Sequence, residues 1–209
     1  MFNNLKISKS QQINNIVVYF LKSHSQSKKN YLNLSKGLKD NSISIKEFEG
    51  TGYRDLLKVN NTSNENLLLV NGEQIIGHQV KQNRVVASTS LIQSNSEAIV
   101  YVSCGEKNRW SSSTNQEVKT ADTMFFSRNT LGDQNLLWSQ IDKQLDYYGI
   151  KSFTKDAAQV YDKNKLTVDK IVEELKPDKD TIGIALGNHF GITSLDLFSD
   201  PIIFQLYFK

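Results

Sequence analysis

Four residues that could act together lie at the end of one predicted strand. Residues 98–104 alternate between two faces, so Cys104 and Glu106 fall on the same side where the strand ends. Arg109 and Trp110 follow within a few residues. Arginine offers a planar fork of donors for phosphate or carboxylate, and tryptophan offers a flat face for a ring. The pattern predicts a pocket rim suited to a nucleotide or a sugar.

A second group of polar residues follows the Asn71-Gly72 pair. Glu73 comes directly after it, and Gly77 allows close approach of a backbone. The run Lys81-Gln82-Asn83-Arg84 then places two cations and two amides in a row. Such a run can hydrogen-bond phosphate groups or ribose hydroxyls, so Lys81, Gln82 and Arg84 are candidate ligand-binding residues.

If the two groups converge, each residue type has a role. Glu73 or Glu106 would act as acid or base, and Arg84 and Arg109 would hold phosphate. Trp110 would stack on a ring. This hypothesis requires both segments to line one hollow.

Simpler interpretations stay open for the same residues. A lone Cys104 on an apolar face is more often a small buried hydrophobe than a nucleophile. Glu106 and Arg109 could pair only with each other, Trp110 could serve packing, and residues 81–84 could form a solvated loop. In that case the chain is a non-catalytic interaction module whose polar residues form a buried network. The sequence does not decide whether the protein is an enzyme.

Other chemistries and partners find little support. The three histidines do not have metal-ligand spacing, so we predict no metal site, and no glycine-rich phosphate loop or other motif indicates a cofactor. With a net charge of +3 and scattered Lys and Arg, nucleic acid is not an expected partner. The apolar run 16–21 is too short to span a bilayer, and a single cysteine favours a cytoplasmic protein. The oligomeric state is not indicated.

The 209 residues suit one domain, residues 1–209, of the α+β class. We expect a mostly antiparallel sheet, of the kind that forms a sandwich, in the N-terminal half. Its predicted strands are 16–21, 43–48, 84–92 and 98–104. A hairpin with a type I′ turn is also predicted at Asn71-Gly72. The Ser/Thr-rich stretch 111–119 is predicted to be a loop or a flap over a site.

Helices and a β-hairpin are expected from the C-terminal half. Asp133 can cap a helix that Gly149 ends, and Asp200-Pro201 is a helix-start signature. The remaining predicted elements are short helices at 154–160 and 167–175 and strands at 182–186 and 192–198.

Three segments together resemble a known family. They are Val70-Asn71-Gly72-Glu73-Gln74-Ile75-Ile76-Gly77, Lys81-Gln82-Asn83-Arg84-Val85 and Val102-Ser103-Cys104-Gly105-Glu106-Lys107-Asn108-Arg109-Trp110. They resemble the first ARPP family, the ARG and rhodanese-phosphatase-superfamily-associated protein domain, with further similarity from Tyr31 to Glu47 and at Asp133-Gln134.

The resemblance covers residues 31–145, the signature core, and is weaker beyond. Residues 78–80 lengthen the gap before Lys81, and the chain ends sooner after Asp200-Pro201 than we expect of a relative. By genomic association the family implies pathways that use NAD or ADP-ribose derivatives. A small nucleotide-type ligand is therefore the partner that the resemblance implies.

Overall fold

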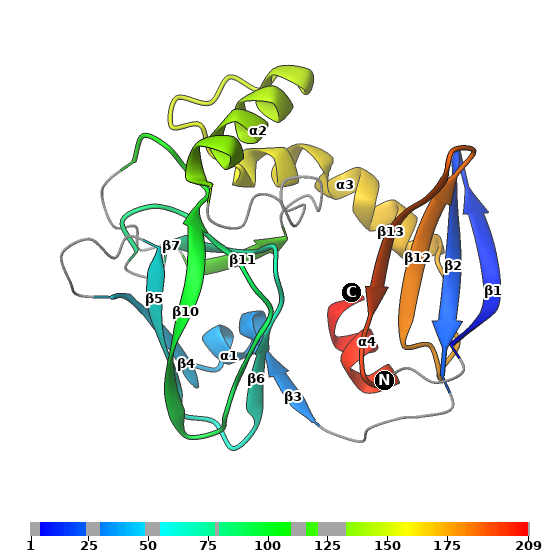
Figure 1. The fold of residues 1–209 in the computed structure, drawn as a ribbon, viewed down its shortest axis with the longest axis horizontal. Helices are drawn as coiled ribbons and strands as arrows, with labels where there is room; N and C mark the ends of the chain where they lie inside the picture. Colours follow the sequence, from blue (N-terminus) through cyan, green and yellow to red (C-terminus); the bar gives the residue numbers. More distant parts are fainter. Residues whose placement is uncertain are drawn as a thin grey trace. The chain divides into compact units, whose positions relative to one another are not determined.

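The computed structural model describes residues 5–23, 30–48, 55–77, 80–109, 116–120 and 133–208. Its α+β class confirms the prediction (Figure 1). The chain forms two compact units. The central unit is Leu32–Lys165, and the split unit combines Met1–Tyr31 with Leu166–Lys209. The expectation of a single domain stays a prediction.

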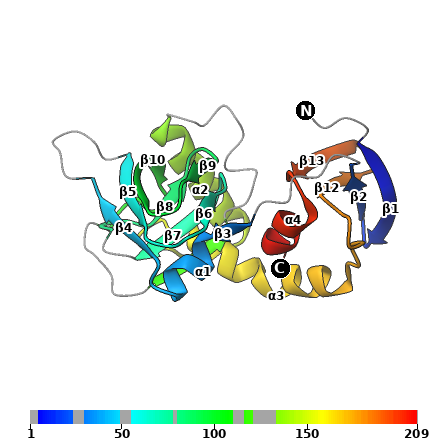
Figure 2. The same ribbon diagram turned by 90° about the horizontal axis from the view of Figure 1, so that it is seen from below.

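Two sheets form the central unit. The larger has six strands, paired antiparallel, in the order β11 (Gln116–Thr120), β7 (Glu73–Gly77), β8 (Arg84–Val86), β10 (Ser96–Cys104), β5 (Leu56–Asn61) and β4 (Ile43–Glu47). The smaller has the order β3 (Tyr31–Asn33), β6 (Asn66–Leu69) and β9 (Ser90–Ile92). Figure 2 shows these strands around a common interior.

One hydrophobic core joins the two sheets. Leu67 and Ile92 of the smaller sheet lie in the same cluster as Leu57 and Val100 of the larger one. Burying each such side chain contributes about 1.5–3 kcal/mol. The arrangement is sandwich-like, and the alternation predicted for β10 is observed: Val100 and Val102 are buried while Ile99 and Tyr101 are exposed.

The turn at Asn71-Gly72 forms, but the predicted hairpin is wrong. The Glu73 N–H donates to the Val70 carbonyl at 3.1 Å, and Gly72 has φ +93° whereas Asn71 has no positive φ. A type I′ turn needs positive φ at both central residues, so this turn is of another type. It leads from β6, which pairs with β9, to β7, which pairs with β8 and β11.

Two other predictions for the central unit need correction, and one strand was missed. The strand predicted at 84–92 is broken into β8 and β9, which belong to different sheets. Residues 116–119, predicted as loop, belong to strand β11, and residues 111–115 lie outside the described residues. Strand β5 was not predicted at all. In each case pairing with distant strands decides the structure, which a local pattern does not reveal.

Three helices lie wholly or partly in the central unit. Helix α1 (Leu34–Lys39) is capped by Asn33, and α2 (Gln134–Tyr147) is capped by the predicted Asp133, with Gly149 at φ +65° beyond its end. Leu137, Ile141 and Leu145 of α2 form a second core with Ala157 and Val160. The two short helices predicted at 154–160 and 167–175 are instead one helix, α3 (Ala158–Glu174), in which Thr167 is an internal residue.

The split unit is a four-stranded antiparallel sheet in the order β1 (Lys6–Ile13), β2 (Ile16–Lys22), β12 (Gly183–Asn188) and β13 (Gly191–Leu197). The C-terminal hairpin and strand β2 were predicted; β1, which is mostly polar, was not. Asp200 caps α4 (Pro201–Tyr207), as its Asp-Pro signature predicts. No helix in the described ranges has the length and apolar character needed to cross a bilayer.

A buried amide fixes two loops at one end of the sandwich. The side chain of Asn61 donates to the carbonyls of Glu65 and Gln93 at 2.9 and 3.0 Å and accepts from the Ser63 hydroxyl at 2.7 Å. We expect Asn61→Ala to lower the free energy of unfolding by about 2 kcal/mol, because it leaves buried groups without partners. Urea denaturation measures this. The exposed Asn64→Ala should cost less than about 0.5 kcal/mol, and equal costs would contradict the prediction.

Candidate functional site

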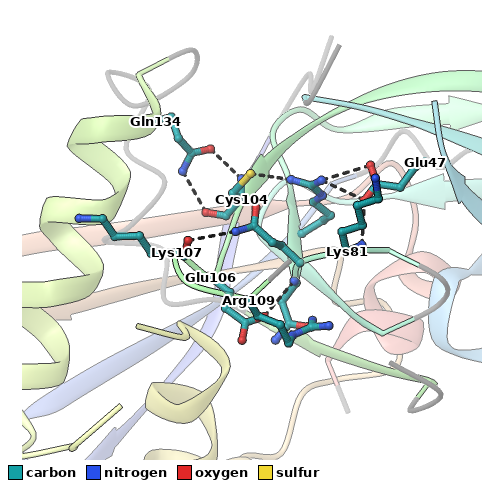
Figure 3. A network of polar contacts seen from close by, with 10 residues as sticks. Glu47, Lys81, Cys104, Glu106, Lys107, Arg109 and Gln134 are labelled. Atoms are coloured by element: carbon teal, nitrogen blue, oxygen red, sulfur yellow. Dashed lines mark hydrogen bonds and ion pairs between the residues drawn. The ribbon is translucent and has the colours of Figure 1, made fainter. Parts of the chain in front are cut away.

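Arg84 is the centre of the first of two polar clusters, and Figure 3 labels its partners Glu47 and Cys104. Its side chain is only 3% exposed, and one guanidinium nitrogen donates to both carboxylate oxygens of Glu47 at 2.9 and 3.1 Å. Another nitrogen contacts the sulfur of Cys104. We call Glu47, Arg84 and Cys104 the Arg84 cluster.

Strand alternation places this cluster at one end of the hydrophobic core. Glu47 continues the inward face of Ile43 and Ile45 on β4, and Cys104 continues that of Val102 on β10. Arg84 is paired directly opposite Cys104 in the sheet. A charged pair at the end of an apolar face is stabilised by the hydrogen bonds between its members, and here one guanidinium nitrogen reaches both carboxylate oxygens.

The backbone of Cys104 makes two hydrogen bonds with the side chain of one residue, Gln134. The side-chain amide of Gln134, in the first turn of α2, accepts from the Cys104 N–H at 2.7 Å and donates to its carbonyl at 2.9 Å. Burial raises the pKa of the Cys104 thiol, although the positive charge of Arg84 opposes this shift. A raised pKa reduces the thiolate fraction at neutral pH, which argues against a nucleophilic role.

Arg109 and Glu106 belong to a second cluster. Arg109 Nε donates to Glu106 at 2.8 Å, and its terminal nitrogen donates to the Asn83 side chain at 2.8 Å. Asn83 in turn donates to Asp156 at 3.1 Å, and its backbone N–H donates to Glu106 at 3.3 Å. We call Asn83, Glu106, Arg109 and Asp156 the Arg109 cluster.

Backbone hydrogen bonds connect the Arg109 cluster to the loop before α3. The Lys107 and Asn108 N–H groups donate to the Thr154 carbonyl, and Ala157 N–H donates to the Gly105 carbonyl. Glu106 and Asp156 form an isolated β-bridge. The polar residues therefore lie where the β-sheet meets the helical part of the same unit.

Glu73 does not join either cluster among the described contacts. Glu73 lies two residues before Ile75 on β7, and Ile75 pairs with Arg84 on β8. The Glu73 carboxylate accepts from the Val70 N–H at 2.7 Å. Burial raises its pKa from 4.5 to about 7, and the Val70 hydrogen bond opposes the shift. Glu73 could exchange a proton near neutral pH, but it is buried behind the turn that it stabilises.

Two buried polar atoms near these clusters have no hydrogen-bond partner among the residues that the structure describes. They are Oε1 of Gln82, whose side chain is fully buried, and Nε of Arg84. The other end of the Gln82 amide donates to the Lys107 carbonyl at 3.1 Å. One acceptor and one donor are thus left for a water molecule or a ligand.

The structure places four of the eight predicted site residues in the two clusters, Arg84 with Cys104 and Glu106 with Arg109. The Gln82 side chain donates to the carbonyl of Lys107, next to Glu106 in the chain, and the backbone N–H of Lys81 donates to Glu47 at 3.0 Å. Trp110 lies outside the described residues. In the part of the chain that the structure describes, no three His, Cys, Asp or Glu residues gather to hold a metal ion.

The predicted site residues did not include three members of the clusters, Glu47, Asn83 and Asp156, nor Gln134, which hydrogen-bonds the backbone of Cys104. Alternation with Ile43 and Ile45 places Glu47 on the inward face of its strand, which is a usable signal. Asn83 lies inside the run that was singled out. Asp156 and Gln134 carry no local sign of their contacts, because their partners are 73 and 30 residues away.

Comparison with known proteins gives one result. Neither the curated proteins nor the solved structures contain a match to this chain. The family model of the ARG and rhodanese-phosphatase-superfamily-associated protein domain matches residues 4–209. The match covers nearly all of the sequence, including both polar clusters, and the chain therefore belongs to the ARPP-1 family.

Proposed function

We propose that this protein is a non-catalytic interaction module, in which the two polar clusters fix the junction between sheet and helices. The observation that carries the proposal is the pairing of Arg84, which is 3% exposed, with both carboxylate oxygens of Glu47. A buried arginine held in this way cannot move to meet a substrate without leaving a buried carboxylate unpaired.

The charges within the clusters support the same proposal. Each arginine is matched by a carboxylate, Arg84 by Glu47 and Arg109 by Glu106. A neutralised pair offers little net attraction to a phosphate group. The two candidate acid–base residues, Glu73 and Glu106, also make their described contacts with different partners.

A second candidate function is binding of an NAD- or ADP-ribose-derived nucleotide. It is favoured by the two unpartnered buried atoms, Gln82 Oε1 and Arg84 Nε, since natural structures seldom leave such groups unsatisfied. A ligand hydroxyl could donate to the first, and a ligand oxygen could accept from the second. Processing of such a ligand would require Glu73 or Glu106 to reach it.

Thermal unfolding with and without NAD and ADP-ribose separates the two candidates. If the clusters form a structural network, we expect neither nucleotide to shift the midpoint of thermal unfolding. Arg109→Ala should then lower the free energy of unfolding by about 2 kcal/mol, because Glu106 keeps a buried charge without its arginine partner. Lys46→Ala, an exposed position on β4, is the control and should change stability by less than about 0.5 kcal/mol.

The opposite pattern would establish the second candidate. In that case a nucleotide raises the midpoint of unfolding of the wild type, and Arg109→Ala abolishes the shift while keeping its own cooperative transition. Such a result would overturn the proposal that the clusters serve structure alone.

A further inference from the structure

The sheet of the split unit has two apolar faces, and helices cover one of them. Val18 and Phe20 of β2 form a core cluster with Leu175, and Ile171 of α3 packs against it. Figure 2 shows α4 and the C-terminal end of α3 on the same side of this sheet. An antiparallel sheet that is covered on one face normally presents polar residues on the other.

The opposite face, which we call the outer face, carries no charged residue. The strand register arranges it in three rows that cross all four strands from β1 to β13. The rows run from Ile7 to Leu197, from Ser10 to Leu195 and from Gln12 to Ile192. Between these ends lie apolar residues of β2 and glycine or alanine residues of β12. All three rows belong to the described part of the chain, and none contains Asp, Glu, Lys or Arg.

Large side chains of the outer face lie over the glycines of β12. A Cβ atom at Gly187 would lie 3.2 Å from the Tyr19 ring and 3.3 Å from the Ile192 side chain. A Cβ atom at Gly183 would lie 2.8 Å from the Leu197 side chain. The larger side chains therefore fill the space above these glycines. Two sheets stack face to face, about 10 Å apart, through apolar layers of this kind.

Three aliphatic side chains of the outer face are exposed. Ile7 and Ile192 are each 61% exposed, and Leu195 is 54% exposed. Among the described residues, no member of the outer face belongs to any of the three hydrophobic core clusters. Contiguous exposed apolar surface of this kind marks an interaction site.

The composition of the outer face favours a second copy of this chain as its partner. Homodimer interfaces are more apolar than other protein interfaces, and charged residues are depleted at their cores. Binding to an anionic membrane surface would instead draw on Lys and Arg, which the outer face lacks.

The area of the outer face sets the expected strength of the contact. With strands about 4.8 Å apart and residues about 3.3 Å apart along each strand, the face covers roughly 400 Å² in projection. Stacking two such faces removes on the order of 1,000 Å² of accessible surface, which is near the lower limit of a specific interface. The contact should therefore be weak and reversible.

We propose that the outer face is the interface of a weak homodimer, in which two copies of this sheet stack face to face about a two-fold axis. The same surface of each copy is used, so no second patch is needed elsewhere on the chain. The proposal goes beyond the proposed function, because the polar clusters of the central unit can serve structure whether or not two copies associate.

Sedimentation velocity of the full chain at increasing concentration tests the homodimer. We expect a monomer at about 5 μM and mostly dimer at about 500 μM, as suits an interface near the lower size limit. Ile192→Lys places a charge in the contact that must lose its water, and it should raise the dissociation constant at least about tenfold. Ile7→Lys, on the other edge strand, should have the same effect.

Ile99→Lys is the matched control, because Ile99 is 52% exposed on β10 of the central unit and lies away from the outer face. It adds the same charge and should leave the dimer unchanged. At about 5 μM, where the chain is monomeric, all three variants should keep the wild-type midpoint of thermal unfolding.

Three results would overturn the homodimer. The first is a wild-type chain that stays monomeric at about 500 μM. The second is a dimer that persists in both Ile192→Lys and Ile7→Lys, or that Ile99→Lys dissociates equally. The third is a monomer that instead sediments with phosphatidylcholine vesicles, because lipid would then be the partner of the outer face.

Discussion

Arg84→Met should lower the free energy of unfolding by about 4 kcal/mol, the largest effect we expect from any single substitution in this chain. The substitution keeps an apolar stem but leaves the Glu47 carboxylate without the two hydrogen bonds at 2.9 and 3.1 Å. It also removes the contact to the Cys104 sulfur. Urea denaturation at neutral pH measures the loss.

Two companion variants test the reason for that loss. Lys58→Met breaks a pair with Glu97 in which both side chains are about half exposed, and it should cost less than about 1 kcal/mol. The double variant Glu47→Leu with Arg84→Met removes both charges and should recover much of the stability, since the unpaired carboxylate is gone. If Lys58→Met costs as much as Arg84→Met, burial of the Arg84 cluster is not the cause.

Glu73→Gln should stabilise the protein above pH 7 and have little effect below pH 4.5. The pKa of Glu73 is about 7 in the folded protein against 4.5 as its usual value, so the folded state holds its proton more tightly. Below pH 4.5 the carboxyl is protonated in both states, and the wild type has no penalty. As pH rises from 4.5 through 7 the folded protein loses stability, by about 3 kcal/mol in total.

The glutamine variant isolates this effect because its side-chain oxygen can still accept from the Val70 N–H. We therefore expect equal stabilities near pH 4.5 and a gain of about 3 kcal/mol for Glu73→Gln at pH 8, measured by urea denaturation at both values. Glu97→Gln, at an exposed position on β10, should show no gain of that size. A Glu73→Gln variant that is no more stable at pH 8 than at pH 4.5, relative to wild type, would contradict the prediction.

Each of these two effects depends on a buried carboxylate, and only one of the two carboxylates was predicted from the sequence to have a role. Glu73 was singled out as a candidate acid or base, and its raised pKa is compatible with that chemistry, yet its hydrogen bond serves the turn at residues 70–73. Glu47 was not a candidate, and it is the partner of Arg84, the more buried of the two arginines that the structure describes. The type of a residue does not reveal which charged group will face it.

The amino-acid sequence by itself determined the features that depend on neighbours within a few residues. Asp133 and Asp200 cap helices where predicted, and Gly149 takes its positive φ just beyond α2. The hairpin of β12 and β13 also forms where alternation and glycines indicated it. Caps, turns and side-chain periodicity are local, so they can be recognised without knowing the rest of the fold.

Only the tertiary structure decided which strands pair and which charges meet. The Asn71-Gly72 turn leads from one sheet into the other, although the sequence around it is that of a hairpin. Arg84 meets Glu47 across 37 residues, and Asn83 meets Asp156 across 73. These contacts follow from the packing of whole sheets and helices. The free energy of that packing is shared among many distant residues, so a short stretch of sequence does not reveal it.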